Sequence, residues 1–152
     1  MKVNVSVKNN ILDCICLLYI LLFVYAAVSK LLGFQNFQAQ LGQSPLLSAY
    51  TGFISISVLV AEFIISILLA VPKLRFIGMF LAFSLMVMFT AYIVVILNYS
   101  SYIPCSCGGI LEKMGWQAHL IFNIIFIVLA IVAIFLMAEK QIHNSKITDH
   151  EA

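Results

Sequence analysis

The residues best suited to chemistry in this chain are its four cysteines, which form two Cys-x-Cys pairs, Cys14 with Cys16 and Cys105 with Cys107. The second pair lies in the sequence PCSCGG at 104–109. A disulfide between cysteines two residues apart would close a short ring, which we expect to be strained and easily reduced. The pair therefore predicts redox exchange. An inert disulfide and a soft-metal site remain as alternatives.

His119 follows this segment, and Trp116 and Asn123 lie three and four residues from it. In a helix all three side chains share one face. An imidazolium near a thiol raises its thiolate fraction, and the thiolate is the form that attacks a disulfide or binds a metal. We therefore take Cys105, Cys107 and His119 as candidate catalytic residues, with simple helix capping as the alternative role of His119.

Three further polar residues fall inside apolar runs: Glu62, Lys30 and Asn123. An ionisable group at the depth of Glu62 costs about 2.5–3.5 kcal/mol on insertion scales. Glu62 could be a protonated structural group, relay protons or orient a bound quinone, which is our only candidate cofactor. Lys30 has the opposite charge, but we place it about 15 Å nearer the membrane surface and expect it to snorkel to the interface. No metal ligands are assigned.

Cys14 and Cys16 lie in the first apolar run. Two residues apart on a helix, their side chains point to nearly opposite faces, so they cannot easily bond to each other. We interpret them as ordinary apolar residues.

The elements that must position these residues are membrane helices. Hydrophobic residues make up 64% of the 152 residues and charged residues 9%, against about 25% charged in soluble domains. Apolar runs long enough to span a bilayer cover 11–32, 48–71, 76–97 and 117–138. The sequence predicts an all-α integral membrane four-helix bundle, a single domain over 1–152 with the Cys-x-Cys loop at 98–116. The lipid bilayer is its expected partner, and scattered charges summing to +2 argue against nucleic acid.

Basic residues in the short connections predict the orientation, because they are enriched on the cytoplasmic side. With the amino terminus inside, only Lys30 and Lys113 face outward, and the inner side holds Lys2, Lys8, Lys73, Arg75, Lys140 and Lys146. We therefore expect a multi-pass protein of the bacterial inner membrane with cytoplasmic termini and a periplasmic Cys105/Cys107 loop. The alternative is that the first run is a cleaved signal peptide. The chain beyond His143 is expected to be a frayed end.

Several motifs resemble the MauE branch of the DoxX-like membrane proteins, over most of the chain. They are YAAVSKL at 25–31, FQAQL at 37–41, SPLL at 44–47, Glu62, the loop at 104–109, Trp116 and His119. The resemblance implies a redox-associated membrane protein that assists maturation, as in methylamine metabolism, beside exported thioredoxin-like partners. The Cys-x-Cys pair departs from the Cys-x-x-Cys of typical thiol oxidoreductases, which leaves the direction of electron flow open.

Our leading hypothesis is a membrane redox-associated maturation factor, and so a possible component of a thiol-disulfide oxidoreductase, in which Cys105 and Cys107 exchange with a partner while His119 tunes the thiolate. One alternative is a non-enzymatic membrane scaffold or small transporter with a structural outer disulfide. Another is a soft-metal-handling membrane protein, because thiolates and imidazole suit Cu(I) or Zn(II).

Overall fold

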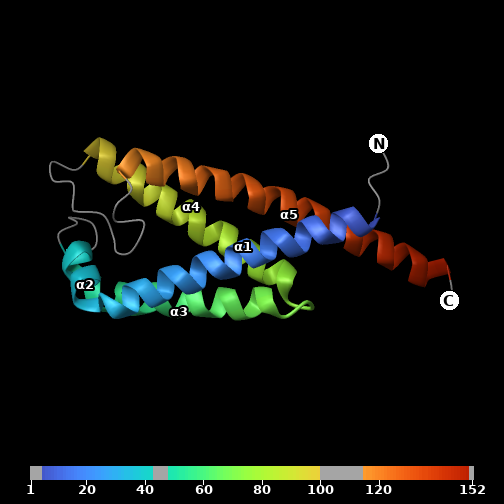
Figure 1. The fold of residues 1–152 in the computed structure, drawn as a ribbon, viewed down its shortest axis with the longest axis horizontal. Coiled ribbons are helices and arrows are strands. Elements are labelled where there is room, and N and C mark those ends of the chain that lie inside the picture. Colours follow the sequence, from blue (N-terminus) through green and yellow to red (C-terminus); the bar gives the residue numbers. More distant parts are fainter. Residues whose placement is uncertain (1–4, 43–47, 100–114, 151–152) are drawn as a thin grey trace.

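The computed structural model describes residues 5–42, 48–99 and 115–150. Four long helices lie along one another, and a short helix sits at one end of the bundle (Figure 1). In chain order the elements are α1 (Val5–Leu32), α2 (Phe34–Gly42), the 3₁₀ turn η1 (Ser48–Tyr50), α3 (Thr51–Ala70), α4 (Arg75–Tyr99) and α5 (Trp116–His150).

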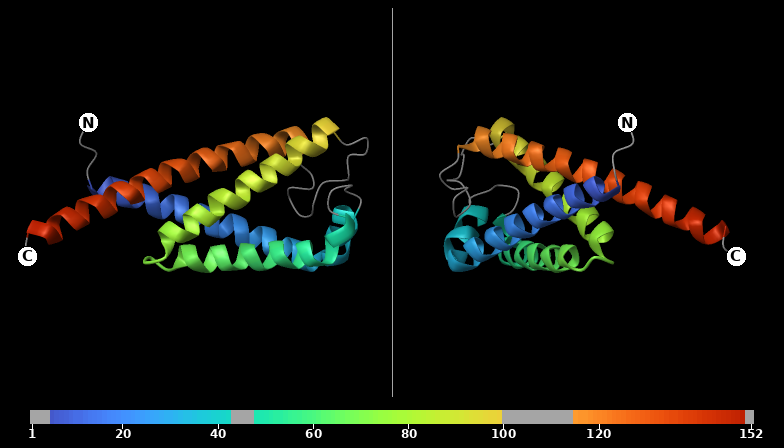
Figure 2. Two further views of the ribbon diagram at one scale, coloured as in Figure 1. Left: turned by 180° about the vertical axis from the view of Figure 1, so that it is seen from behind. Right: turned by 45° about the vertical axis from the view of Figure 1, so that its right-hand side comes forward.

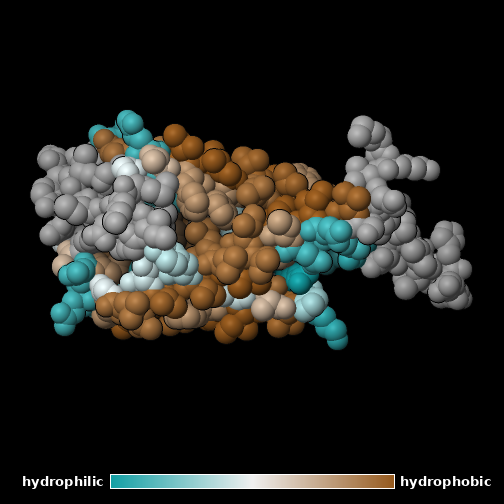
Figure 3. Space-filling view, viewed as in Figure 1, coloured by the Kyte–Doolittle hydropathy of each residue, from teal (hydrophilic) through white to brown (hydrophobic). Residues whose placement is uncertain are grey.

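All four long helices are long and apolar enough to cross a membrane, over Val7–Leu32, Ser48–Ala70, Arg75–Val95 and Gln117–Gln141. Many large apolar side chains point outward, among them Leu21, Phe53, Ile67 and Phe135. In the space-filling view apolar residues cover the middle of the face shown, and hydrophilic residues gather near both ends (Figure 3). Such a surface suits hydrocarbon rather than water. The predicted all-α membrane bundle is confirmed.

The bundle has two distinct ends (Figure 2). At one end, here called the α2 end, α1 finishes, α3 begins, α4 finishes and α5 begins. The opposite end, here called the termini end, holds the start of α1, the tight α3–α4 connection and the last part of α5. This up-and-down order follows because each successive span crosses the bilayer in the direction opposite to the one before it.

The bundle interior combines large and very small side chains. Tyr19 and Phe23 of α1 are almost completely buried, and Ala82, Ala130 and Ala133 lend α4 and α5 the small surfaces that let membrane helices approach closely. The Tyr19 hydroxyl donates a hydrogen bond of 2.5 Å to the Phe126 carbonyl oxygen of α5. This hydroxyl therefore has a partner despite its burial, as a polar group in hydrocarbon requires.

The α3–α4 connection is as tight as Pro72 predicts, since α4 begins at Arg75. Gly78, in the first turn of α4, lies against the end of α3. A Cβ atom placed there would come within 3.0 Å of the Leu68 Cβ and 3.1 Å of the Leu69 backbone nitrogen. Any larger residue would force these neighbours to shift by a few tenths of an ångström, so glycine suits this close approach of the two helices.

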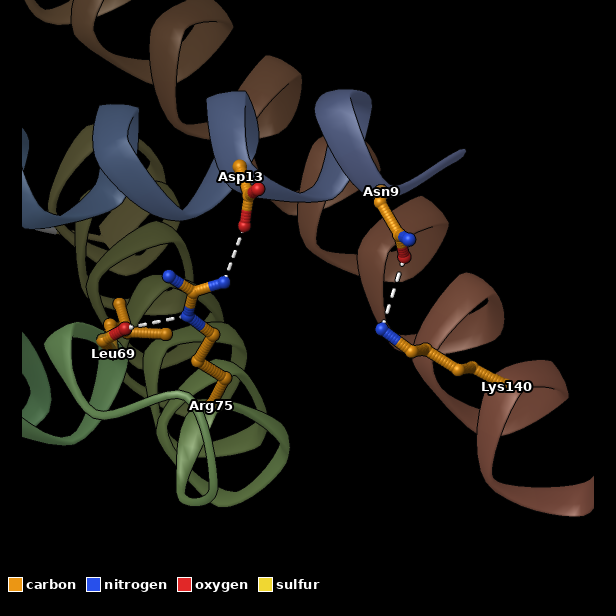
Figure 4. Close-up of polar contacts among 5 residues, drawn as sticks. All are labelled: Asn9, Asp13, Leu69, Arg75 and Lys140. Carbon is orange, nitrogen blue, oxygen red and sulfur yellow. Dashed lines mark hydrogen bonds and ion pairs between the residues drawn. The ribbon is translucent and has the colours of Figure 1, made fainter. Parts of the chain in front are cut away.

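Polar side chains tie the helices together at the termini end (Figure 4). The Arg75 guanidinium lies between the Asp13 carboxylate, 2.5 Å away, and the Leu69 carbonyl oxygen, 3.2 Å away. Lys140 donates to the Asn9 side-chain oxygen at 3.0 Å, and Lys8 pairs with Glu139 at 2.7 Å. These contacts link α1 to both α4 and α5.

Two features differ from the sequence analysis. The connection after the first span contains a helix of its own, α2, which the search for membrane spans did not predict. Helix α5 also continues to His150, so the expected frayed end beyond His143 is wrong. Extending an existing helix is far easier than nucleating one, because each added residue gains a hydrogen bond.

Candidate functional site

A cavity of about 320 Å³ lies inside the bundle toward the α2 end. Its wall is mainly apolar, and the side chains that contribute to it come from α1, α2, α3, α4 and α5. Four of the predicted site residues line it: Lys30, Glu62, His119 and Asn123. They belong to α1, α3 and α5, so the fold gathers polar groups that are up to 93 positions apart (123 − 30) around one space.

Lys30 and Glu62 form a buried ion pair, with 2.5 Å between Lys30 Nζ and Glu62 Oε1. The side chain of Glu62 is 1% exposed and that of Lys30 is 12% exposed. The expectation that Lys30 snorkels to the interface is therefore wrong. The Lys30 ammonium also lies 5.8 Å from the ring centroids of both Phe37 and Phe89, within the range of cation–π attraction.

The two side chains meet because they lean toward each other. Helices α1 and α3 run in opposite directions, and side chains on a helix tilt toward its amino terminus, so Lys30 leans into the bundle and Glu62 leans toward the α2 end. The 15 Å gap counted only the rise along the helices. Helix α2 packs beside the pair on the first turns of α3, where Phe37 and Leu41 contact Val58 and Gln38 donates to Ser55 Oγ at 3.3 Å.

Two polar atoms at the cavity are buried without a hydrogen-bond partner among the described residues, Glu62 Oε2 and Asn123 Nδ2. Asn123 is 3% exposed, and its α5 neighbour His119 is half-buried. Both line the cavity, which confirms that they share a face of the helix; the Trp116 side chain lies outside the described part of the chain. A buried polar atom left unpaired costs about 1–3 kcal/mol, so each such atom calls for an explanation.

Cys105 and Cys107 lie outside the described residues. The connection that carries them leaves α4 at Tyr99 and reaches α5 at Trp116, so both of its anchor points are at the α2 end, where the cavity lies. The first cysteine pair behaves as expected: Cys16 is buried in the core, Cys14 is exposed on the other side of α1, and both are free. In the described segments, no three His, Cys, Asp or Glu side chains gather as metal ligands.

The two aromatic residues around Lys30, Phe37 and Phe89, were not among the residues predicted from the sequence. One signal for the first was present: Phe34, Phe37 and Leu41 recur at the three- to four-residue spacing of an amphipathic helix. No comparable signal exists for Phe89, because every position of an apolar span looks alike in a sequence.

Fold and cavity together define an integral membrane protein with four apolar helices and a polar cluster in its interior. The family model described as methylamine utilisation protein MauE matches residues 8–136, and the chain therefore belongs to the MauE family. The matched region contains the whole cavity. Comparisons with curated proteins and with solved structures gave no match.

Proposed function

We propose that this MauE-family membrane protein is a redox-associated maturation factor whose Cys105 and Cys107 exchange a disulfide with an exported thioredoxin-like partner. The observation that carries the proposal is the position of the cavity. Lys30, Glu62 and His119 converge at the end of the bundle from which the Cys-x-Cys connection starts and to which it returns.

The exchange needs no group beyond Cys105, Cys107 and the two cysteine thiols of the partner. A partner thiolate attacks one sulfur of the Cys105–Cys107 disulfide, and the other sulfur leaves as a thiolate that takes up a proton. The second partner thiol then attacks the mixed disulfide and releases the reduced pair. The partner has been oxidised by two electrons and the Cys-x-Cys pair reduced by two. The reverse sequence would reduce the partner.

We assign His119 to supporting the thiolate from α5. It lies in the first turn of that helix, where its backbone N–H donates to the Gly115 carbonyl oxygen at 3.0 Å. This ring is the ionisable group of the described α5 that lies nearest, along the chain, to the cysteine segment. As a base, this imidazole would accept the proton of a nearby thiol and so favour the reactive thiolate.

The central test replaces each cysteine separately with serine in cells. Either Cys105→Ser or Cys107→Ser should trap a mixed disulfide with the partner, because the resolving thiol is missing. Thiol alkylation followed by gel electrophoresis should show that the pair in the unsubstituted protein is oxidised and that mild reductant opens it. Cys14→Ser, which changes an exposed cysteine of α1, is the matched control and should trap nothing.

The proposal is contradicted if two results occur together. The Cys105/Cys107 pair would not respond to mild reductant, and neither single serine variant would trap a partner. The protein would then be better described as a membrane scaffold or small transporter. A pair that stays reduced and binds copper or zinc stoichiometrically would instead support the soft-metal function.

We also propose that the termini end faces the cytoplasm of a bacterial inner membrane. Lys8, Lys73, Arg75 and Lys140 lie at that end, whereas Lys30 is the only Lys or Arg side chain described at the α2 end. This charge asymmetry is the usual orientation signal. The Cys105/Cys107 connection would then open to the periplasm, where exported thioredoxin-like proteins work.

The orientation is tested with Leu74→Cys in a variant that lacks the four native cysteines. Leu74 lies in the α3–α4 connection and is 38% exposed. A membrane-impermeant maleimide should label it only after the inner membrane has been opened. Labelling in intact cells would reverse the topology and would place the Cys-x-Cys connection in the cytoplasm.

A further inference from the structure

Two buried polar atoms at the cavity have no hydrogen-bond partner among the described residues. Glu62 Oε2 needs a donor, and Asn123 Nδ2 needs an acceptor. Glu62 is fully buried and Asn123 nearly so, on helices α3 and α5 that each contribute to the cavity wall. Because the carboxylate's other oxygen is already held by Lys30, its position is fixed while Oε2 stays free.

The charge and the wall of the cavity limit what can satisfy these atoms. Lys30 and Glu62 together carry no net charge, so a charged ligand would bring an unpaired charge into an apolar interior at high cost. The rest of the wall includes Leu22, Phe23, Val58 and Phe122. The volume of about 320 Å³ falls within the range of about 300–1,000 Å³ typical of small-molecule sites. The ligand should be neutral, largely apolar and equipped with oxygen atoms.

We propose that this cavity binds the head group of a membrane quinone and its reduced quinol. A quinol hydroxyl donates to Glu62 Oε2, and a quinone or quinol oxygen accepts from Asn123 Nδ2. The ring lies in a wall rich in aromatic side chains, which favour stacked or edge-to-face contacts. The quinol satisfies both atoms and the quinone only the Asn123 amide, so the reduced form binds more tightly.

This inference rests on the proposed function for its role in turnover, where the quinone is the electron acceptor for the Cys105–Cys107 dithiol. Two S–H bonds break and one S–S bond forms, and the two electrons and two protons convert the quinone to the quinol. The regenerated disulfide then oxidises the partner. A quinone acceptor therefore sets the direction of exchange toward disulfide formation in the partner.

A phospholipid acyl chain is the competing occupant. It would fill the apolar volume but would leave Glu62 Oε2 and Asn123 Nδ2 without partners. The two occupants can be distinguished by substitution. Binding of a quinone depends on the side chains of Glu62 and Asn123, whereas binding of an acyl chain does not.

Binding is measured on the full chain in nanodiscs of synthetic phosphatidylcholine. A photoreactive azidoquinone should label peptides that line the cavity, and decylubiquinone and decylubiquinol should both compete, the quinol more strongly. Asn123→Ala should weaken both competitors about threefold to tenfold, the effect of one hydrogen bond. Asn98→Ala, which changes an exposed asparagine of α4 outside the cavity wall, is the matched control and should change nothing.

Glu62→Gln provides the second variant. It replaces an ionised acceptor with a neutral amide of the same shape, so the affinity for decylubiquinol should fall about tenfold or more. The affinity for decylubiquinone should not fall, because the glutamine amide at position 62 can donate a hydrogen bond to a carbonyl oxygen of the quinone. Labelling spread over the lipid-facing surface, or competition unaffected by both variants, would overturn the quinone site and would favour an acyl chain.

The Cys105→Ser/Cys107→Ser double variant separates this inference from the proposed function. It should bind decylubiquinone like the unsubstituted protein, because the described cavity wall contains neither cysteine. If the protein traps a partner but binds no quinone, this inference fails and the proposed function stands. If it binds quinone but traps no partner, the exchange fails and the binding site stands.

Discussion

Opposite charges meet at both ends of the bundle, but in different surroundings. At the termini end, Asp13 and Glu139 have side chains that are 60% and 63% exposed, and their partners Arg75 and Lys8 are also partly open to solvent. At the α2 end, the Glu62 side chain is 1% exposed and pairs with Lys30 inside the bundle. The ion-pair distances are similar, between 2.5 and 2.7 Å.

The difference in exposure determines what each pair can do. Water can satisfy the remaining oxygen of Asp13, and both oxygens of Glu139 already accept hydrogen bonds from Lys8. Those pairs therefore join helices and leave no buried polar atom without a partner. The remaining oxygen of Glu62 is buried away from water and has no hydrogen-bond donor among the described residues. Asn123 Nδ2 is a second unpaired polar atom beside the same cavity. A buried pair is weak evidence for stability, because desolvation offsets much of the attraction. Its position beside a cavity with one unpaired acceptor and one unpaired donor fits ligand binding better than stabilisation.

The largest expected effect is that of Lys30→Met. Removing the ammonium leaves the Glu62 carboxylate buried and uncompensated, which should reduce the free energy of unfolding by about 3–5 kcal/mol. Unfolding in mixed detergent micelles measures this loss. The Lys30→Met/Glu62→Met double variant should recover most of it, because apolar side chains of similar size often replace a buried ion pair at little cost.

Two results would contradict this difference between the ends. Lys30→Met could cost no more stability than the loss of an exposed pair, or the double variant could be as unstable as the single one. In the first case Glu62 would have access to water. In the second, Lys30 would stabilise the bundle through its contacts with Phe37 and Phe89 rather than through Glu62.

The sequence was sufficient to predict the fold class because one physical effect dominates it. A run of about 20 apolar residues must be helical in a bilayer, since no water can satisfy its backbone. Helix α2 was not predicted, because its nine residues are too few and too polar to form a membrane span. Its docking on α3 depends on tertiary contacts, such as Gln38 with Ser55, that no single segment encodes.

The candidate site was predictable in its members but not in its arrangement. Glu62, Lys30 and Asn123 stood out because polar residues are costly in apolar runs, and His119 because it follows the cysteine segment. Their convergence on one cavity depends on how far each helix is shifted along its neighbours. That shift depends on tertiary contacts such as Gly78 against Leu68, and the lengths of the apolar runs do not reveal it.

The smallest effects are expected at the termini end, where Asp13→Asn and Arg75→Gln test the exposed pair. Asp13→Asn should reduce the free energy of unfolding by less than about 1 kcal/mol, because an exposed ion pair gains little. Arg75→Gln should cost somewhat more, since the guanidinium also donates to the Leu69 carbonyl oxygen near the end of α3, and such a bond contributes about 0.5–1.5 kcal/mol.

The Asp13→Asn effect should shrink further in 1 M salt, which screens exposed charges. Unfolding in mixed micelles at low and high salt measures both, with Lys30→Met as the buried reference whose cost salt should hardly change. An Asp13→Asn loss as large as that of Lys30→Met would mean that the two ends do not differ in the way their exposure indicates.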